Sequence, residues 1–469
     1  MRRTVLLTLV AALVLLVSSV PAFAQGSYPP GITWNSPFVV QNMGSTTAMV
    51  YVEYYRISDG AFISTATESF SLQPGRGRLV DPKLNPDPNL TAGLYSVVIS
   101  SDEPVAAVVS EEATKHQMGY TGLPAGGEKV YLPNITKNYY TFNTPFYIQN
   151  SGSSTTSVTI EFFYFTTGQK VTSATRIISL PPNVSYEYDP ALVPDSELPT
   201  NKQYSVVATA DSGGSIVAAV NQISSNTYLA YAGFGGGADV VYAPNIVKGY
   251  AGYITPAVIQ NVGTTTAYVT VEYYGMTDGV FYSAAGAKNV PLGPGLSLPE
   301  RPWWWSDSVL PNNKQYSMII RGNPGDKLVA IVNQNRSGPT YIDGTAYNAF
   351  TTGYQNVYIP WVMKGYGGYL TPIVIQNVGT TPATFSVRYF DLDTGVEYPN
   401  AGAKNYTLAA GQSVPERPWT YSDTNLPSNK RFTVVIEGQA GNKLAAICTH
   451  VKSGGVDLSF AYEGMGRNP

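Results

Sequence analysis

A stretch in which apolar and polar side chains alternate recurs along this chain of 469 residues. It is clearest from residue 267 to residue 274, where Val269, Val271 and Tyr273 share one side of an extended backbone. A period of two predicts a half-buried β-strand, and a slip of one residue would expose the whole inward set. Equivalent inward sets occur three more times: Val50, Val52, Tyr54; Val158, Ile160, Phe162; and Phe385, Val387, Tyr389.

Each alternating strand follows a short apolar segment that ends in Gln-Asn-x-Gly. The four copies of this motif are Gln41, Asn42, Gly44; Gln149, Asn150, Gly152; Gln260, Asn261, Gly263; and Gln376, Asn377, Gly379. We expect the motif to form a turn, because Asn and Gly tolerate a left-handed backbone. A second turn follows the alternating strand and predicts a hairpin in which glycine supplies a positive φ; its glycines are Gly60, Gly168, Gly279 and Gly395.

A proline-containing apolar segment opens three of the four repeats. Its copies are Val130-Tyr-Leu-Pro-Asn-Ile135, Val241-Tyr-Ala-Pro-Asn-Ile246 and Val357-Tyr-Ile-Pro-Trp-Val362. Proline inside such a segment suits an edge strand, because the missing N–H group then faces no partner. In the first repeat only Tyr28-Pro-Pro-Gly-Ile32 stands in this place.

These copies divide the chain into a leader at 1–24 and repeats at 25–129, 130–240, 241–356 and 357–469. A length of about 110 residues suits one sandwich per repeat and is far too long for a solenoid unit. Each repeat contains about seven short strands separated by turns, which is typical of an antiparallel β-sandwich. The connectors are short, so the sequence predicts an extended rod of about 150 Å.

The first residues have the pattern of an export signal. A basic start, Met1-Arg2-Arg3, precedes an apolar run, and Ala22-Phe23-Ala24 has the pattern of a cleavage site. The alternative is a membrane anchor, but the apolar run is short for a span. The sequence therefore predicts a secreted or cell-surface protein whose mature chain has no membrane span. Cleavage lowers the formal charge from −3 to −5, which argues against nucleic acid as a partner.

The repeats resemble bacterial immunoglobulin-like surface domains. The Gln-Asn-x-Gly motif followed by Ala-x-Val-x-Val-x-Tyr-Tyr is similar to cell-adhesion-related repeat domains of secreted and S-layer-associated proteins. Tyr95, Tyr204 and Tyr316 each begin an apolar strand after a turn, as in the tyrosine corner of immunoglobulin-type sandwiches, whereas Phe432 departs from that pattern. The resemblance implies four tandem immunoglobulin-like sandwiches and a structural or adhesive role at the cell exterior.

Residues that carry chemistry are few. The two histidines, His116 and His450, lie in different repeats, and we expect each on the surface or in a loop. No nucleophile motif or zinc spacing is present, so the sequence predicts no catalytic residue, no cofactor and no metal site. The alternative of a calcium loop at Asp391–Gly395 lacks most of the ligands. The single cysteine, Cys448, is expected to be a buried thiol, the alternative being a disulfide between molecules.

One covalent alternative stays open. Lys248, Glu272 and Asn333 recur as Lys137, Glu161 and Asn221, and lysine, an acid and asparagine on neighbouring strands resemble the intramolecular isopeptide bonds of some surface-fibre sandwiches. The fourth repeat lacks the acid and the asparagine, which argues against the bond.

An aromatic loop is the least usual stretch of the sequence. Trp303, Trp304 and Trp305 are adjacent, and Trp419 and Tyr421 occupy the same loop of the fourth repeat. Neighbours in an extended chain point to opposite sides, so the three tryptophans cannot all enter one core. They either pack at a junction between repeats or form an exposed platform for a sugar or a partner protein.

The sequence thus predicts a non-catalytic structural or adhesive protein outside the cell, built as a rod. Its expected partners are other copies of itself or other cell-surface proteins. The alternative function is binding of a polysaccharide or a partner protein through the loop around Trp303–Trp305. The outward positions of the alternating strands are unusually aromatic, and they either bury against connectors or form contacts between molecules: Tyr51, Tyr55, Phe163, Tyr274 and Phe390.

Overall fold

The computed structural model describes residues 26–124, 126–337, 342–452 and 457–468, so the predicted leader at 1–24 lies outside the described residues. The fold is all-β and antiparallel within each repeat, as predicted. The helical elements of the described part are 3-10 turns of three residues each. They are η1 Ser64–Ala66, η2 Pro82–Leu84, η3 Thr172–Ala174, η4 Pro190–Leu192, η5 Tyr250–Gly252, η6 Pro302–Trp304, η7 Tyr366–Gly368 and η8 Pro418–Thr420.

The second repeat shows the complete unit, which is a sandwich of two four-stranded sheets. One sheet has the order β11 (Arg176–Leu180), β10 (Thr156–Tyr164), β13 (Lys202–Ala210) and β8 (Lys129–Lys137). The other has the order β12 (Ser185–Tyr188), β9 (Phe146–Asn150), β14 (Ile216–Ile223) and β15 (Tyr228–Ala232). The unit therefore has eight strands, one more than the seven that the sequence indicated.

The third and fourth repeats have the same plan with small additions. The third contains β16 (Val240–Lys248), β17 (Tyr253–Ile254), β18 (Ala257–Asn261), β19 (Ala267–Gly275), β20 (Val290–Leu292), β21 (Ser297–Glu300), β22 (Lys314–Arg321), β23 (Leu328–Ser337) and β24 (Ile342–Asn348). The fourth contains β25 (Asn356–Lys364), β26 (Tyr369–Leu370), β27 (Ile373–Asn377), β28 (Ala383–Asp391), β29 (Glu397–Tyr398), β30 (Tyr406–Leu408), β31 (Ser413–Glu416), β32 (Lys430–Gly438), β33 (Leu444–Lys452), β34 (Asp457–Glu463) and β35 (Met465–Arg467).

The first repeat is incomplete. Its described strands are β1 (Phe38–Asn42), β2 (Ala48–Arg56), β3 (Glu68–Leu72), β4 (Gly77–Val80), β5 (Tyr95–Ser101), β6 (Val105–Ala113) and β7 (His116–Thr121). One sheet runs β4-β1-β6-β7, and the other has only three strands, β3-β2-β5. The segment at Tyr28–Ile32, expected to stand for the opening strand, is not a strand and does not pair with β5.

The core of each unit forms where the alternation predicted it. All twelve inward residues of the alternating strands, β2, β10, β19 and β28, are buried. The predicted tyrosine corner is confirmed as well, because the hydroxyl groups of Tyr95, Tyr204 and Tyr316 donate to carbonyl oxygens four or five residues upstream, at 2.8, 2.5 and 2.5 Å. These bonds pin the chain at the corner before β5, β13 and β22.

The Gln-Asn-x-Gly motif works differently from the expectation of a left-handed turn. None of its glycines has a positive φ. Instead, the buried Asn261 amide donates to Thr265 O and Leu292 O, and its Oδ1 accepts from the Gly263 N–H. A Cβ on that glycine would lie 3.1 Å from the Asn261 Oδ1, so a larger residue would crowd the asparagine that holds the turn. The hairpin glycines, by contrast, do have the predicted positive φ, between 64° and 72°.

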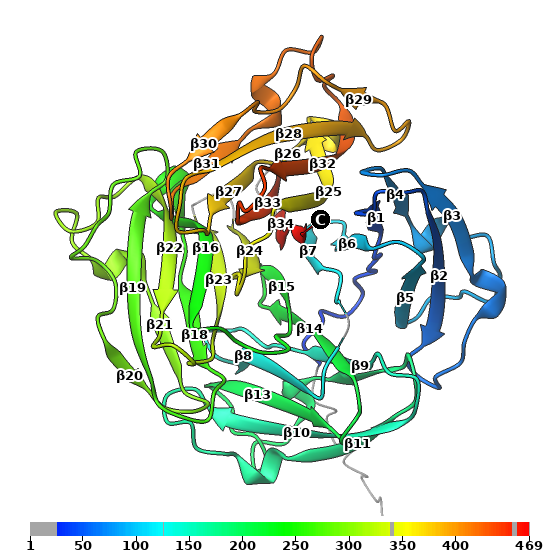
Figure 1. Ribbon diagram of the computed structural model, residues 1–469. Helices are drawn as coiled ribbons and strands as arrows, with labels where there is room; N and C mark the ends of the chain where they lie inside the picture. The colour runs from blue at the N-terminus through cyan, green and yellow to red at the C-terminus, as the bar shows by residue number, and fades with distance from the viewer. Residues whose placement is uncertain (1–25, 125, 338–341, 453–456, 469) are drawn as a thin grey trace, which may run out of the picture.

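The four repeats close into a ring, and the predicted rod is wrong (Figure 1). One strand near the end of each repeat, namely β7, β15, β24 or β34, lies at the centre of the molecule, where these strands pack against one another. The first and fourth repeats meet directly, because β34 pairs with β7 in parallel. The short connectors do not hold the units in a straight row. Contacts between successive units close into a ring when the turns from unit to unit add up to a full circle.

The seams of the ring repeat a single polar contact. The residue that follows the tyrosine-corner position carries a hydroxyl that reaches the next unit at every seam: Ser96 to Ser185 Oγ, Ser205 to Gly295 O, Ser317 to Gly411 O, and Thr433 to Gly75 O. Phe390, expected on the outside, is buried here against Arg76 of the first unit. Several of the exposed aromatic positions predicted from the sequence therefore serve contacts within one molecule.

Small-angle scattering separates the ring from the rod. A compact particle of this chain length has a radius of gyration of about 22 Å, whereas a rod of about 150 Å has one of about 43 Å. We expect the mature protein in dilute solution to give the smaller value, with a distance distribution that ends well below 100 Å by the same scaling. A radius near that of the rod would contradict the closed ring.

Candidate functional site

The most unusual feature of the ring is the absence of an opening strand in its first unit. In the second, third and fourth units the opening strand pairs with the strand of the tyrosine corner, as β8 pairs with β13. The corresponding strand of the first unit, β5, pairs only with β2 among the described residues. The other edge of β5 therefore has unpaired backbone N–H and C=O groups. Such an edge can pair with a strand of another chain.

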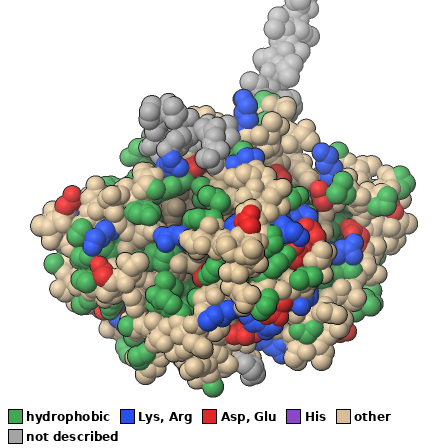
Figure 2. Space-filling model, turned by 90° about the horizontal axis from the view of Figure 1, so that it is seen from above, with side chains coloured by type: hydrophobic (Ala, Val, Ile, Leu, Met, Phe, Trp, Pro, Cys, Tyr) green, Lys and Arg blue, Asp and Glu red, His purple; other side chains and the backbone are tan. Residues whose placement is uncertain are grey.

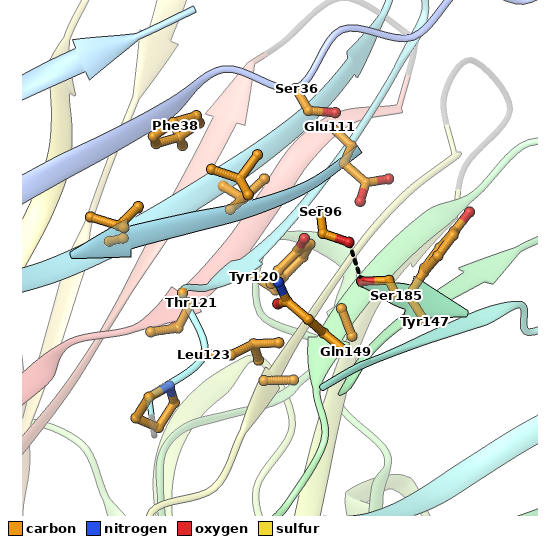
Figure 3. A pocket seen from close by; sticks show the side chains of 18 of the residues that line it. Ser36, Phe38, Ser96, Glu111, Tyr120, Thr121, Leu123, Tyr147, Gln149 and Ser185 are labelled. Carbon is orange, nitrogen blue, oxygen red and sulfur yellow. Dashed lines mark hydrogen bonds between the residues drawn. The ribbon is translucent and has the colours of Figure 1, made fainter. Parts of the chain in front are cut away.

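A cavity of about 2010 Å³ occupies this place. One wall is β5, and the opposite wall consists of β6 and the end of β7. Figure 3 shows Phe38, Glu111 and Tyr120 of the first unit lining it, with Tyr147 and Gln149 of the second unit beyond. Residues that follow the central strands β15, β24 and β34 complete the lining, so all four repeats contribute to the cavity.

The apolar lining of the cavity matches side chains that are fully buried in the other units. Val97 and Ile99 of β5 are half-buried, whereas their counterparts Val206 and Ala208 are completely buried. Likewise Val105 and Val109 of β6 are half-buried, and the corresponding positions of β14, β23 and β33 are buried. The first unit therefore has an unfinished core with the shape left by one strand.

The charged lining of the cavity is acidic. It contains five glutamates and one lysine: Glu103, Glu111, Glu112, Glu187, Glu463 and Lys83. Glu111 Oε2 accepts a hydrogen bond of 2.7 Å from the Asn221 amide, which also donates to the Tyr28 hydroxyl. Burial raises the pKa of the Glu111 carboxyl to about 7, against the lowering effect of the Asn221 bond. The cavity thus favours a cationic occupant over an anionic one.

The aromatic loop predicted as a binding or junction site lies on η6 and η8, away from the cavity lining. Trp304 is 58% exposed and Trp303 38% exposed, while Trp305 packs against the core of its own unit and donates to Glu300. Trp419 is 37% exposed, and Tyr421 packs edge-on against Tyr389. In each unit the loop therefore has one inward aromatic residue, Trp305 or Tyr421, beside exposed tryptophan. Its role as a ligand site stays a prediction.

The histidines are not where the sequence placed them. His450 is fully buried in β33, where its Nε2 contacts Trp361 O at 2.7 Å and burial lowers its pKa to about 3. His116 lies in the central strand β7, and its ring lies tilted against that of Tyr228, with the centroids 4.2 Å apart. Both surroundings reflect packing, since aromatic rings rather than further ligands surround each imidazole. In the described ranges no group of three or more His, Cys, Asp or Glu side chains is arranged to hold a metal.

The structure also shows the contacts of the residues considered for a disulfide, an isopeptide bond and a calcium loop. Cys448 is fully buried, as expected, and burial raises the pKa of its thiol to about 12. Lys248, considered for an isopeptide bond, points instead at Asp307, 2.8 Å away. Asp391, at the start of the candidate calcium loop, accepts from the Lys430 ammonium at 2.6 Å.

The face of the ring shown in Figure 2 carries no dominant charge. On the face shown in Figure 2, basic and acidic side chains are interspersed, with no large patch of either sign. Within the described part of the chain, no helix has the length and apolar character needed to cross a membrane.

The sequence did contain one sign of the cavity. Three repeats open with the Val-Tyr-x-Pro segment, and the first does not. The missing segment indicates an open site only when the ring holds the first unit against its neighbours.

Comparisons with known proteins add little. No protein-family model matches the chain, and no curated protein matches it. A solved structure described as Thermotoga maritima 1070 is 20% identical over 24% of this chain and 94% of that one, with a TM-score of 0.20. The pilus backbone RrgB of Streptococcus pneumoniae is 12% identical over 54% and 83% of the two chains, with a TM-score of 0.13. Full-length RrgB is 8% identical over 92% and 86%, with a TM-score of 0.12. At these scores the matches carry no argument about this chain.

The raised pKa of Glu111 predicts a pH dependence that the Glu111→Gln variant removes. Because the folded carboxyl ionises near pH 7 and the unfolded one near its ordinary value, the free energy of unfolding falls as pH rises through that window. The loss is at most about 3 kcal/mol at pH 8. We expect Glu111→Gln to match the wild type at pH 4 and to be more stable at pH 8 in urea titrations.

The exposed Glu128→Gln variant is the control for removal of one charge, and it should follow the wild type at both pH values. If Glu111→Gln is no more stable than the wild type at pH 8, Glu111 is solvated in the cavity and the assignment of a buried carboxyl is wrong.

Proposed function

We propose that this protein is a non-catalytic structural or adhesive component of the cell exterior that joins another chain through the cavity of its first unit. The single observation that carries the proposal is the coincidence of the cavity with the place of a missing strand. Strand addition to an open sheet edge supplies main-chain hydrogen bonds for affinity, and side-chain pockets supply specificity.

Three further features support this function over catalysis. The cavity lining is mainly apolar, and its charged side chains are five glutamates and one lysine. The leader predicted from the sequence directs the chain out of the cytoplasm. The central strands pack the four repeats into one body. Such a body suits a protein that transmits force or keeps its partners at a fixed distance, rather than one that opens and closes around a substrate.

A charge placed in the cavity tests the proposal. Ile99 lines the cavity and is half-buried, so Ile99→Lys should block an incoming strand by adding bulk and charge beside the edge of β5. In the cells that export the protein, we expect the wild type to sediment with the cells and the variant to be released mostly into the medium. Ile177→Lys, at a position 71% exposed on the second unit, is the matched control and should partition like the wild type.

The variant must be folded for this result to count, so its melting temperature is measured alongside, and Val109→Lys on the facing strand serves as a second block. Equal partition of folded Ile99→Lys, folded Val109→Lys and the wild type would refute attachment through the cavity.

Carbohydrate binding is the second candidate, because Trp303, Trp304 and Trp419 expose aromatic faces on equivalent loops. Stacking of a sugar on an exposed tryptophan changes the fluorescence of the indole. If the loop binds glycans, Trp304→Ala should remove the fluorescence response to cell-wall polysaccharides, while Tyr140→Ala, at an exposed aromatic of the second unit, should leave it unchanged. A wild type that shows no response to any glycan would eliminate this candidate.

A further inference from the structure

In each of the three complete units, an equivalent lysine holds the end of the opening strand. Lys137, Lys248 and Lys364 end β8, β16 and β25, and all three are buried. The Lys137 Nζ donates to Val193 O at 2.5 Å, to Asp195 at 2.6 Å and to Leu198 O at 2.8 Å. The same three partners recur as Trp305 O, Asp307 and Leu310 O, and as Tyr421 O, Asp423 and Leu426 O.

The first unit has the same three acceptor positions but no opening-strand lysine. The segment Asp81-Pro-Lys-Leu-Asn-Pro-Asp-Pro-Asn-Leu90 aligns with Asp189-Pro-Ala-Leu-Val-Pro-Asp-Ser-Glu-Leu198, which places Asn85 O, Asp87 and Leu90 O at the three acceptor positions. Both segments begin with the same turn, η2 or η4, in which the Asp side chain accepts from the backbone two residues on. Within the described residues, neither carbonyl accepts a hydrogen bond and Asp87 has no ion pair.

A second set of hydrogen bonds holds the middle of each opening strand. The hydroxyl groups of Tyr231, Tyr347 and Tyr462 donate to the carbonyl of the residue after the proline, at 3.0, 2.7 and 2.6 Å. The side chain of that residue, when it is asparagine, donates to Gln222 or Gln334. The first unit keeps both partners, because Tyr120 aligns with the tyrosines and Glu111 with the glutamines, and both line the cavity (Figure 3).

We propose that the cavity of the first unit accepts an extended segment of another protein that has the pattern apolar-Tyr-apolar-Pro-Asn-apolar-x-Lys, paired antiparallel to β5 with its lysine between Asn85, Asp87 and Leu90. This inference rests on the proposed function and specifies the partner. The acidic lining complements the lysine. The pairing of β8 with β13 gives the register, in which the lysine lies opposite Gly93 and the apolar residue after asparagine opposite Tyr95.

Synthetic peptides taken from this chain are suitable probes, because residues 129–137 and 240–248 have the required pattern. Each peptide carries a fluorophore and is titrated with the mature full-length protein, and fluorescence anisotropy reports binding. We expect saturable binding by both peptides and none by a scrambled sequence. Replacement of the last lysine by alanine should weaken binding roughly tenfold or more, since a charge-assisted set of three hydrogen bonds is lost.

Matched variants of the protein locate the site. Asp87→Asn and Tyr120→Phe should weaken binding at least severalfold, whereas Asp195→Asn and Tyr231→Phe, the same changes in the filled second unit, should leave it unchanged. Equal binding of the scrambled peptide, or binding that does not depend on the lysine and on Asp87, would overturn the assigned pattern. If no peptide binds although Ile99→Lys still releases the protein from cells, this inference fails and the proposed function stands; if neither result appears, both fail.

Discussion

The burial of one strand from each repeat at the centre of the molecule is the constraint on which the structure depends. Asp457 at the start of β34 accepts from the backbone N–H groups of Tyr228 and Gly344, on two other central strands. Burial raises its pKa to about 8. A buried carboxyl is tolerated only where such donors satisfy it, so this side chain fixes how three repeats meet. Glu463, at the other end of β34, contacts Asn348 and Thr121 in the same manner.

Closure of the ring gives the missing strand its significance. In a row of separate units, an unpaired edge on the first sandwich would face solvent and would be a hazard for aggregation. In the ring, the same edge faces a cavity whose other walls are β6 and β7 of the first repeat together with residues of the second, third and fourth repeats. The site is thereby shielded from unspecific pairing and open to a segment of one particular shape. A partner that completes the core would gain buried apolar contacts at Val97, Ile99, Val105 and Val109 as well as main-chain hydrogen bonds.

The ring also explains why the outward aromatic positions are so frequent. Phe390 packs against Arg76 across the seam between the fourth and first units, and the ring of Tyr274 lies beside Gly411 across the seam between the third and fourth. Sequence reasoning counted these side chains among candidates for contacts between molecules. Intramolecular seams and intermolecular interfaces use the same residue types, so composition could not distinguish them.

Local periodicity determined the strands, their inward faces, the hairpin glycines and the tyrosine corner, because each depends on residues that are close along the chain. The sequence by itself also showed that the first repeat has only Tyr28-Pro-Pro-Gly-Ile32 in the place of the opening segment. It could not show that the units close on themselves, since the turn between units depends on how β7, β15, β24 and β34 pack. Only the tertiary structure showed that the missing strand leaves a cavity with an acidic lining. It also showed the three acceptor positions at Asn85, Asp87 and Leu90, which the opening-strand lysine occupies in the other units. The physical reason is that burial and charge at this site are properties of four repeats together, and no single repeat contains them.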